Sequence, residues 1–511
     1  MPTHLPSCSS CSDDASASSD KAHASDCASL DSRDEIQKAP KYSVSRLLFV
    51  HIGAAMTLFL ATTDATIVST SLPTIVSELV ASQSQYTWVG VAYMLTQTAG
   101  QPLYGRLVRF GRAKGSVLYV SMMIFALGSL LCGAAKSIMS LIIFRGLAGL
   151  GGGGIVSSVW VITSEIVEPK NRAKWSQALS ITWSCSAVAG PILGGLFSTG
   201  GFSTTISWRW AFYMNLPVCL FAFLLLSVSL RDVTLGHAKH ASWKNFTEKF
   251  DFIGLLLFML GTSCLVIGFS FAMSNGWTSP STLLLVTLGP VILACGGFYE
   301  VRTTREALFP PTAFKSITVV IILIVTFLHN FVFTSGTFYL ALYFQAVDGM
   351  TPLQAGVQML PYSLGSSLAS VPAAWFIGFC QKRKNDTSGQ KWTIVGGLLI
   401  STLGFSLLII LKDTSSRFAQ ICFPLIAGIG IGFLFHAPYQ VFVKALHPSE
   451  LATGTSAFFL VRFTGATIGL VSPSASFGSS SINWRLLSLI EPLSLRNEVL
   501  GAVALAIQVG F

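Results

Sequence analysis

The chain has 511 residues, of which 52% are hydrophobic and only 11% are charged. Soluble domains usually carry about 25% charged residues, so this composition excludes a soluble globular protein and indicates a chain surrounded by lipid. The net charge of +10 does not indicate nucleic-acid binding, because the basic residues lie in short connections between apolar segments.

Residues 1–44 differ in composition from the rest of the chain. Ser, Ala and Asp dominate and apolar residues are sparse, which predicts a disordered cytosolic tail. No cleavable signal peptide is recognisable, so we expect the first span to direct the chain to the membrane. Cys8, Cys11, His23 and Cys27 are possible zinc ligands, but no apolar residues nearby would form a folded core around a metal.

Apolar runs of roughly 20 residues recur from about residue 45 onward, and this length crosses about 30 Å of hydrocarbon. The predicted spans are 46–72, 86–105, 115–134, 138–164, 175–198, 209–230, 252–273, 281–299, 318–345, 354–379, 392–411, 417–441 and 453–475. A weaker candidate covers 497–511. The sequence therefore predicts an all-α integral membrane protein with about fourteen transmembrane helices.

The basic residues predict how these spans are oriented. Connections after even-numbered spans hold Arg106, Arg109, Arg112, Lys114, Lys170, Arg172, Lys174, Arg231, Lys239, Lys244, Lys249, Arg302, Arg305, Lys315, Lys382, Arg383, Lys384 and Lys391. Connections after odd-numbered spans hold little beyond Lys136, Arg209, Lys412 and Arg417. Because cytoplasmic loops carry the excess of Lys and Arg, this alternation places the N-terminus in the cytosol.

Asp64 is the acidic residue that lies well inside a predicted span. A carboxylate in hydrocarbon costs about 2.5–3.5 kcal/mol on insertion scales, so such residues face the bundle interior and are usually functional. Burial favours the neutral form of a carboxyl group and makes reversible protonation possible. We interpret Asp64 as a proton or cation site; the alternative is a buried side chain that is hydrogen-bonded to its neighbouring threonines.

Two glycine-rich stretches point to close helix packing. Arg145 begins a fourth-span segment in which glycines at 149 and 151–154 would let other helices approach closely. A phosphate-binding loop is excluded, because no Lys-Ser/Thr follows and no strand precedes. In the fifth span, Gly190-Pro191 with Gly194-Gly195 indicates either a structural kink or a gating element.

In this order, several segments resemble the major facilitator superfamily, and within it the fourteen-span drug:proton antiporter family common in fungi. The segments are 64–73 (DATIV followed by LP), 145–154 (RGLAGLGGGG), 190–195 (GPILGG), 208–217 (WRWAFYMNLP) and 339–361 (YLALYFQAV through AGV and LP). The resemblance covers residues 50 to about 470. It implies two six-helix bundles with two extra helices between them, alternating access, and a role for Arg145 in proton transfer.

On this resemblance we expect an N-terminal bundle at 45–230, a linker with two extra helices at 231–300 and a C-terminal bundle at 301–511. The family's last helix would still be running at Phe511, so we expect that bundle to be incomplete. The family's gate loop after the second helix corresponds to Gly105, Arg109, Gly111 and Arg112. Arg109 stands where the family has an aspartate that latches the two halves, so we expect an altered gate.

Amphipathic side chains within the spans are candidates for a substrate cavity, because ligand pockets combine aromatic residues with a few polar groups. They are Tyr93, Gln97, Trp183, Asn330, Tyr343, Gln358 and Tyr439. Arg462 is a further charge within a span and is expected to pair across the bundle. The histidines of the spans lie on separate helices without paired spacing, so we expect neither a metal nor another cofactor.

The sequence thus predicts a proton-coupled exporter of small organic molecules such as drugs or toxins. Its partners would be the substrate, protons and the bilayer, and we expect a monomer in the plasma membrane, with the vacuolar membrane equally compatible with the topology. Alternatives are a siderophore or basic amino acid carrier of the same superfamily and a membrane sensor that does not transport. An enzyme is disfavoured, because the spans contain no nucleophile with a base and no carboxylate pair.

Overall fold

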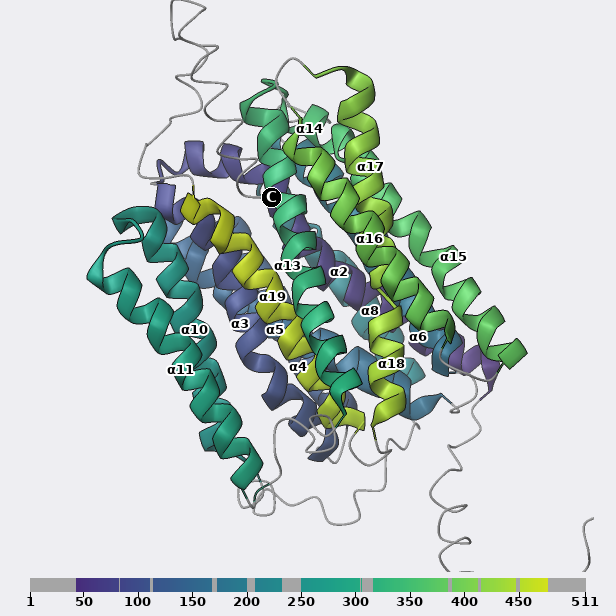
Figure 1. Ribbon diagram of the computed structural model, residues 1–511. Coiled ribbons are helices and arrows are strands. Elements are labelled where there is room, and N and C mark those ends of the chain that lie inside the picture. The colour runs from purple at the N-terminus through teal and green to yellow at the C-terminus, as the bar shows by residue number, and fades with distance from the viewer. Residues whose placement is uncertain are drawn as a thin grey trace, which may run out of the picture.

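The computed structural model describes residues 43–81, 83–110, 114–167, 172–199, 207–231, 250–303, 305, 316–384, 388–411, 415–446 and 451–476. The fold is an all-α bundle of long helices that run roughly alongside one another (Figure 1). The helices are α2 (Val44–Glu78), α3 (Gln83–Phe110), α4 (Lys114–Ala134), α5 (Ile138–Ile166), α6 (Arg172–Ser198), α7 (Trp210–Tyr213), α8 (Asn215–Ser229), α10 (Phe252–Asn275), α11 (Pro280–Arg302), α13 (Ile317–Ala346), α14 (Pro352–Gln358), α15 (Leu360–Lys384), α16 (Ser388–Ile409), α17 (Arg417–Leu434), α18 (Ala437–Ala445) and α19 (Leu451–Ser476).

Each predicted span from 46–72 to 453–475 coincides with one of these helices or with a pair of shorter helices. Within the described residues, 12 helical segments are long and apolar enough to cross a membrane. The predicted span 86–105 falls in α3, which is more polar and does not belong to those 12. Its 28 residues nevertheless extend over about 42 Å at 1.5 Å per residue. The weaker candidate at 497–511 lies outside the described residues.

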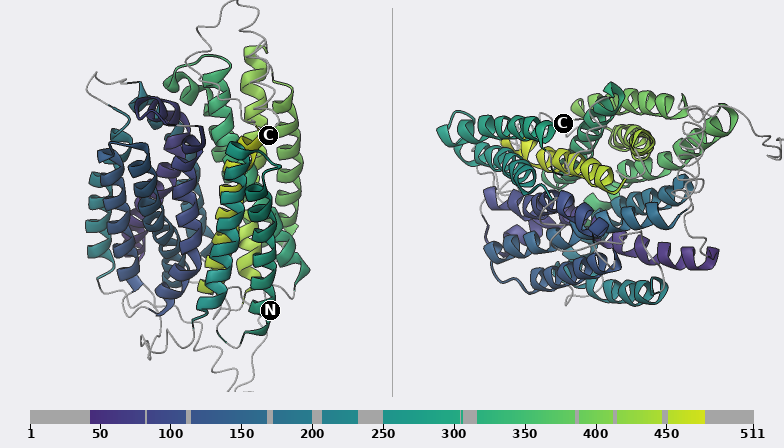
Figure 2. Two further views of the ribbon diagram at one scale, coloured as in Figure 1. Left: turned by 90° about the vertical axis from the view of Figure 1, so that its left-hand side faces the viewer. Right: turned by 90° about the horizontal axis from the view of Figure 1, so that it is seen from below.

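The helices form two groups that lie side by side, as both views in Figure 2 show. We call α2–α8 the N-terminal half and α13–α19 the C-terminal half. The halves meet where α3 packs against α19, where α6 packs against α14 and α15, and where α2 packs against α13. The intervening pair, α10 and α11, packs against α19 and α3 through α10 and leaves α11 at the periphery (Figure 1).

Burial follows from this arrangement. In the most apolar window of α19, 89% of the residues are buried, whereas the corresponding share is 17% in α11. The exposed residues of the peripheral helices are large and apolar, as Leu284 and Val301 on α11 illustrate. This distribution is expected where lipid, not water, surrounds the bundle, because an apolar side chain loses nothing by facing hydrocarbon.

The glycines of α5 allow two helices to approach it at once. Gly149, Gly152 and Gly153 face α3, and Gly151 and Gly154 face α4. A Cβ atom on Gly153 would lie 2.8 Å from the carbonyl oxygen and 3.2 Å from the Cα atom of Gln97. Any side chain there would therefore press on the backbone of α3, which cannot yield without moving the helix.

We expect Gly153→Leu to lower the thermal stability of the protein in detergent, because overpacking costs about 1–3 kcal/mol. Gly396→Leu on α16 is the matched control, since no atom lies within 4 Å of the added Cβ and both changes gain the same helix propensity. Melting temperatures from tryptophan fluorescence provide the measurement. Equal melting temperatures for the two variants would contradict close α3–α5 packing at this position.

Candidate functional site

The charged centre of the N-terminal half is an ion pair between Asp64 on α2 and Arg145 on α5. Arg145 Nη1 donates to Asp64 Oδ2, and both side chains are buried. Arg145 Nη2 also donates to the backbone oxygen of Asp64 at 3.3 Å, and its Nε donates to the oxygen of Val89 on α3 at 3.2 Å. One guanidinium group therefore joins three helices.

Neutral groups complete this site. Asn215 Nδ2, at the start of α8, donates to Asp64 Oδ1 at 3.0 Å and to Ser129 Oγ at 3.2 Å. The guanidinium carbon of Arg145 lies 4.3 Å from the ring centre of Tyr93 and 5.6 Å from that of Phe212. Aromatic faces stabilise a cation most strongly when water is excluded. The arrangement can hold a carboxylate and its guanidinium partner together away from water.

The alternative interpretation of Asp64, as a side chain bonded to its neighbouring threonines, does not describe this geometry. Thr62 donates to the backbone oxygen of Leu58 at 2.8 Å, and Thr66 donates to that of Thr62 at 3.3 Å. Both are ordinary contacts of a threonine with its own helix. The partners of the Asp64 carboxylate come instead from α5 and α8.

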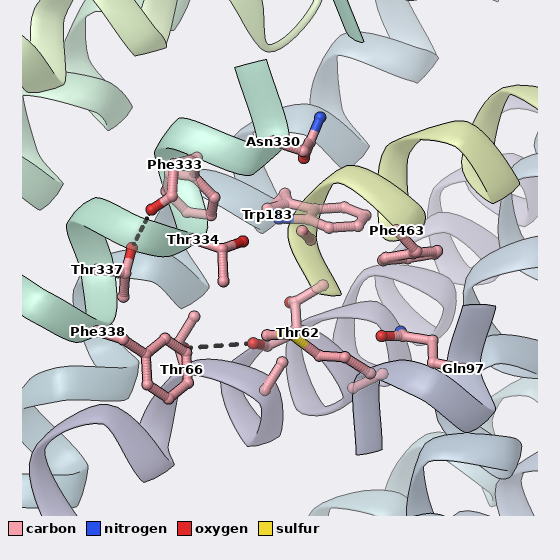
Figure 3. Close-up of a pocket in the computed structure, with 14 residues that line it drawn as sticks. Thr62, Thr66, Gln97, Trp183, Asn330, Phe333, Thr334, Thr337, Phe338 and Phe463 are labelled. Carbon is pink, nitrogen blue, oxygen red and sulfur yellow. Dashed lines mark hydrogen bonds between the residues drawn. The ribbon is translucent and has the colours of Figure 1, made fainter. Parts of the chain in front are cut away.

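A cavity lies between the two halves, immediately beside this centre. Its lining residues are Ala61, Thr62, Ala65 and Thr66 on α2, Met94 and Gln97 on α3, Trp183 on α6, Asn330, Phe333, Thr334, Thr337 and Phe338 on α13, and Phe463 and Ala466 on α19. In Figure 3, Asn330 and Trp183 lie close together at one end and Thr62 and Thr66 at the other. The lining is apolar and aromatic, with neutral polar groups and no charged side chain among these residues.

The cavity is small in this conformation. It leaves about 40 Å³ for the centres of water molecules, which is room for a few waters but not for a drug-sized ligand. Trp183 of the lining belongs to a set of aromatic contacts between the halves near the end of α5. The rings of Trp160 and Tyr439 lie 4.7 Å apart between centroids, and Trp183 stacks on Phe459 at 6.3 Å.

The residues that the sequence proposed for a cavity divide into two groups. Gln97, Trp183 and Asn330 line the space between the halves. Tyr93 instead donates to the oxygen of Ala61 at 2.8 Å and covers Arg145. The remaining three lie outside the lining: Tyr343 is buried beside Phe344, Gln358 ends α14, and Tyr439 belongs to the aromatic contacts described above. The part of all seven in substrate binding stays a prediction.

The glycines of α6 allow close packing against α2 within the N-terminal half and against α14 of the C-terminal half. Gly190 and Gly194 face Thr66, Ile67 and Thr70 on α2, and the Thr70 hydroxyl donates to the oxygen of Pro191 at 2.7 Å. Gly195 faces Pro352 and Leu353 of α14, and across this contact Gly356 faces Pro191. Pro191 lies within the continuous helix α6. This segment is therefore a close contact between the halves at the end of α6.

The expected gate loop starts later than the sequence indicated. α3 continues through Gly105 and Arg109 to Phe110, because its polar residues can extend the helix beyond the apolar stretch that defined the predicted span 86–105. Gly111 and Arg112 lie outside the described residues. The altered gate stays a prediction.

Several site residues were not foreseen from the sequence. Asn215 belongs to the 208–217 segment, but its bond to Asp64 depends on how α8 packs against α2. Thr334, Thr337 and Phe338 line the cavity and follow helical spacing on α13, a signal shared by any buried helix face.

Arg462 on α19, which the sequence indicated as a charge within a span, lies behind the lining, with its guanidinium carbon 4.2 Å from the ring centre of Trp183. It was expected to pair across the bundle, yet no described carboxylate lies within ion-pair distance of it.

Comparison with known proteins agrees with this architecture. The profile of the Major Facilitator Superfamily matches residues 54–470. The chain belongs to the major facilitator superfamily. The resemblance inferred from its motifs is thereby confirmed, and the chain is a membrane transporter and not an enzyme.

The sequence relatives within the superfamily include fungal efflux pumps. The efflux pump dotC of Dothistroma septosporum is 32% identical over 423 residues, which cover 82% of this chain and 69% of the relative. The MFS-type efflux pump LUC4 of a Fusarium species is 30% identical over 457 residues, covering 89% and 78%. An uncharacterized transporter of Schizosaccharomyces pombe is 30% identical over 479 residues, covering 91% and 78%.

Solved structures share the fold at low sequence identity. A bacterial homologue of the human lysosomal transporter Spinster, in an inward-facing and occupied conformation, has a TM-score of 0.56 and 15% identity, covering 92% of this chain and 94% of that chain. A mutant of the peptide transporter POT in complex with sulfate has a TM-score of 0.58 and 14% identity, covering 90% and 92%. These similarities extend to the fold alone.

We expect Asp64→Asn to destabilise the protein, because it leaves the Arg145 guanidinium buried without its counterion. Breaking a buried pair by removing one partner costs about 3–5 kcal/mol. Arg145→Met added to Asp64→Asn should recover much of this loss, since no charge then remains. Unfolding of the three proteins in detergent, followed by melting temperature, tests the coupling. Additive losses in the double variant would show that the two groups do not act as a pair.

Proposed function

We propose that this chain is an antiporter that exports small organic molecules in exchange for protons. The observation that carries the proposal is the double role of one stretch of α2. Ala61, Thr62, Ala65 and Thr66 line the cavity, and Asp64, between them in sequence, bonds to Arg145 on another side of the helix. A change in the charge of Asp64 that moves α2 therefore changes the wall of the cavity.

The proton step follows from the ion pair. While Asp64 is ionised, its carboxylate neutralises Arg145 and holds α2 against α5. A proton that binds a carboxylate oxygen of Asp64 leaves the guanidinium charged and without a counterion. Because an uncompensated buried charge costs several kcal/mol, the helices gain free energy by moving until Arg145 reaches water or another partner. Protonation thus favours a second arrangement of the N-terminal half.

Two contacts between the halves would open alternately during transport. The Trp160–Tyr439 contact lies near the end of α5, and the Gly195 and Gly356 contact lies near the end of α6. α5 and α6 are consecutive and antiparallel, so these contacts are on opposite sides of the cavity. Binding near the midplane between two such closures is the usual arrangement in transporters built from repeated bundles.

Different observations support the direction of transport and the class of substrate. The relatives dotC and LUC4 are named efflux pumps, which favours export over uptake. The aromatic lining with a few neutral polar groups suits apolar organic molecules. A carrier for basic amino acids is disfavoured, because the described lining offers no carboxylate to a cationic substrate.

The proposal also includes the membrane in which the transporter lies and the orientation of its N-terminus. The excess of Lys and Arg in connections after even-numbered spans supports a cytosolic N-terminus. With that orientation, the Trp160 contact closes the cavity towards the cytosol and the Gly195 contact closes it towards the outside. We place the transporter in the plasma membrane as a monomer, where export removes the substrate from the cell.

The test uses vesicles from yeast that lack their own drug exporters, oriented so that export becomes uptake. Acidifying the lumen should drive accumulation of a transported compound from a panel of fluorescent organic acids, amines and neutral compounds, and a protonophore should abolish it. Asp64→Asn should lose accumulation by at least 10-fold. It should still exchange labelled for unlabelled compound, because the amide mimics the protonated carboxyl group.

Glu78→Gln is the matched control, because Glu78 is a half-exposed carboxylate near the end of the same helix. It should retain accumulation at equal amounts of folded protein, as measured by fluorescence size-exclusion chromatography. Accumulation that survives the protonophore, or that Asp64→Asn retains in full, would contradict proton coupling through Asp64.

A further inference from the structure

Among the residues that the structure describes, two arginines are buried in the bundle, and one of the two has a carboxylate partner. Arg145 is paired with Asp64. Arg462 on α19 is only 4% exposed, yet in the part of the chain that the structure describes no Asp or Glu forms an ion pair with it. Its Nη2 atom is buried and has no hydrogen-bond partner among those residues. A desolvated cation in this state attracts an anion strongly.

Arg462 contacts two residues that line the cavity. Its Nε donates to Oδ1 of Asn330 at 2.9 Å, and Asn330 lines the cavity. Its guanidinium carbon lies 4.2 Å from the ring centre of Trp183, which also lines the cavity. The next residue, Phe463, belongs to the lining as well. Figure 3 shows Asn330, Trp183 and Phe463 around this part of the cavity. Because Arg462 contacts Asn330 and Trp183, its cation lies next to the lining.

The Nε and Nη2 groups of Arg462 together suit a carboxylate. The Nε and Nη2 groups of a guanidinium present parallel N–H donors that bind both oxygens of a planar carboxylate. In this conformation Nε is bonded to a neutral amide oxygen, and Nη2 has no described acceptor. A ligand carboxylate that displaces the Asn330 oxygen would form both bonds and neutralise the buried charge.

We propose that Arg462 is the substrate-binding cation and that the transported molecules are aromatic or apolar organic acids. The acid group binds Nε and Nη2 of Arg462, and the apolar body packs against Phe333, Phe338 and Phe463 of the lining. This proposal rests on the proposed function, because it names the substrate class of the same cavity. An organic cation would meet the charge of Arg462 with no acidic side chain in the described lining to offset it.

The first experiment measures binding to the purified full chain by equilibrium dialysis. The probes are naphthalene-2-carboxylate, its uncharged amide and the corresponding naphthylmethylammonium ion, which share the same ring system. The native protein should bind the carboxylate at least 10-fold more tightly than either of the others. Equal affinity for the three probes, preference for the ammonium ion, or no measurable binding of the carboxylate would overturn the proposal.

Variants then identify the residue responsible. Arg462→Gln should weaken carboxylate binding at least 10-fold and leave amide binding unchanged, and Arg462→Lys should give an intermediate result because it keeps the charge without the paired donors. Arg383→Gln, at an exposed position near the end of α15, is the control and should bind like the native protein. Retained carboxylate preference in folded Arg462→Gln would overturn the assignment.

A transport assay distinguishes a failure of this proposal from a failure of the proposed function. If Arg462 governs carboxylate binding but luminal acid drives no accumulation of the acid, proton-coupled export fails and the anion site stands. If acid-driven accumulation occurs but Arg462→Gln transports acids and amides with unchanged preference, export stands and the anion site fails.

Discussion

The ion pair between Asp64 and Arg145 is the interaction on which the packing of the N-terminal half depends. A guanidinium group inside a membrane protein requires a counterion and acceptors, because no water is available to replace them. Arg145 obtains these from α2 and α3 at once, and Tyr93 of α3 covers its face at 4.3 Å. These contacts require α3 to lie very close to α5. The glycines of α5 that face α3, including Gly149 and Gly153, remove the side chains that would prevent this approach.

Each half contains a buried arginine, and the two arginines have different kinds of partner. The cavity lies between the two halves. In the N-terminal half the charge of Arg145 is balanced within the protein. In the C-terminal half Arg462 has an amide oxygen and an aromatic face as partners. On the proposals made above, the balanced pair responds to protons and the unbalanced cation responds to the substrate. Arg462 also contacts Trp183 of the other half, so a ligand bound as proposed would lie beside a contact between the halves.

The helices between the halves contribute to this asymmetry. α10 packs against α19 and α3, and the apolar window of α19 is the most enclosed among the described spans. Arg462 is thereby kept away from lipid, where an unpaired charge would be still more costly. α11 completes the pair and presents large apolar side chains outward. α10 thus covers the helix that carries Arg462. The contacts at Trp160 and at Gly195 are made by the two halves themselves.

The helices could be predicted from the sequence alone, because membrane spans need long apolar segments that satisfy their own backbone hydrogen bonds. It also singled out Asp64 and Arg145, since charges are rare in such segments, and the family followed from ordered motifs such as 145–154. The polar ends of helices, as at 106–110 of α3, carry no comparable signal. Which side chains contact one another depends on how the helices pack. Asp64 and Arg145 lie 81 positions apart in sequence, and their pairing depends on packing of α2, α3 and α5. The partners of Arg462 could not be predicted in the same way. The sequence shows a charge within a span, but the packing of the neighbouring helices places Asn330 and Trp183, and not a carboxylate, beside it.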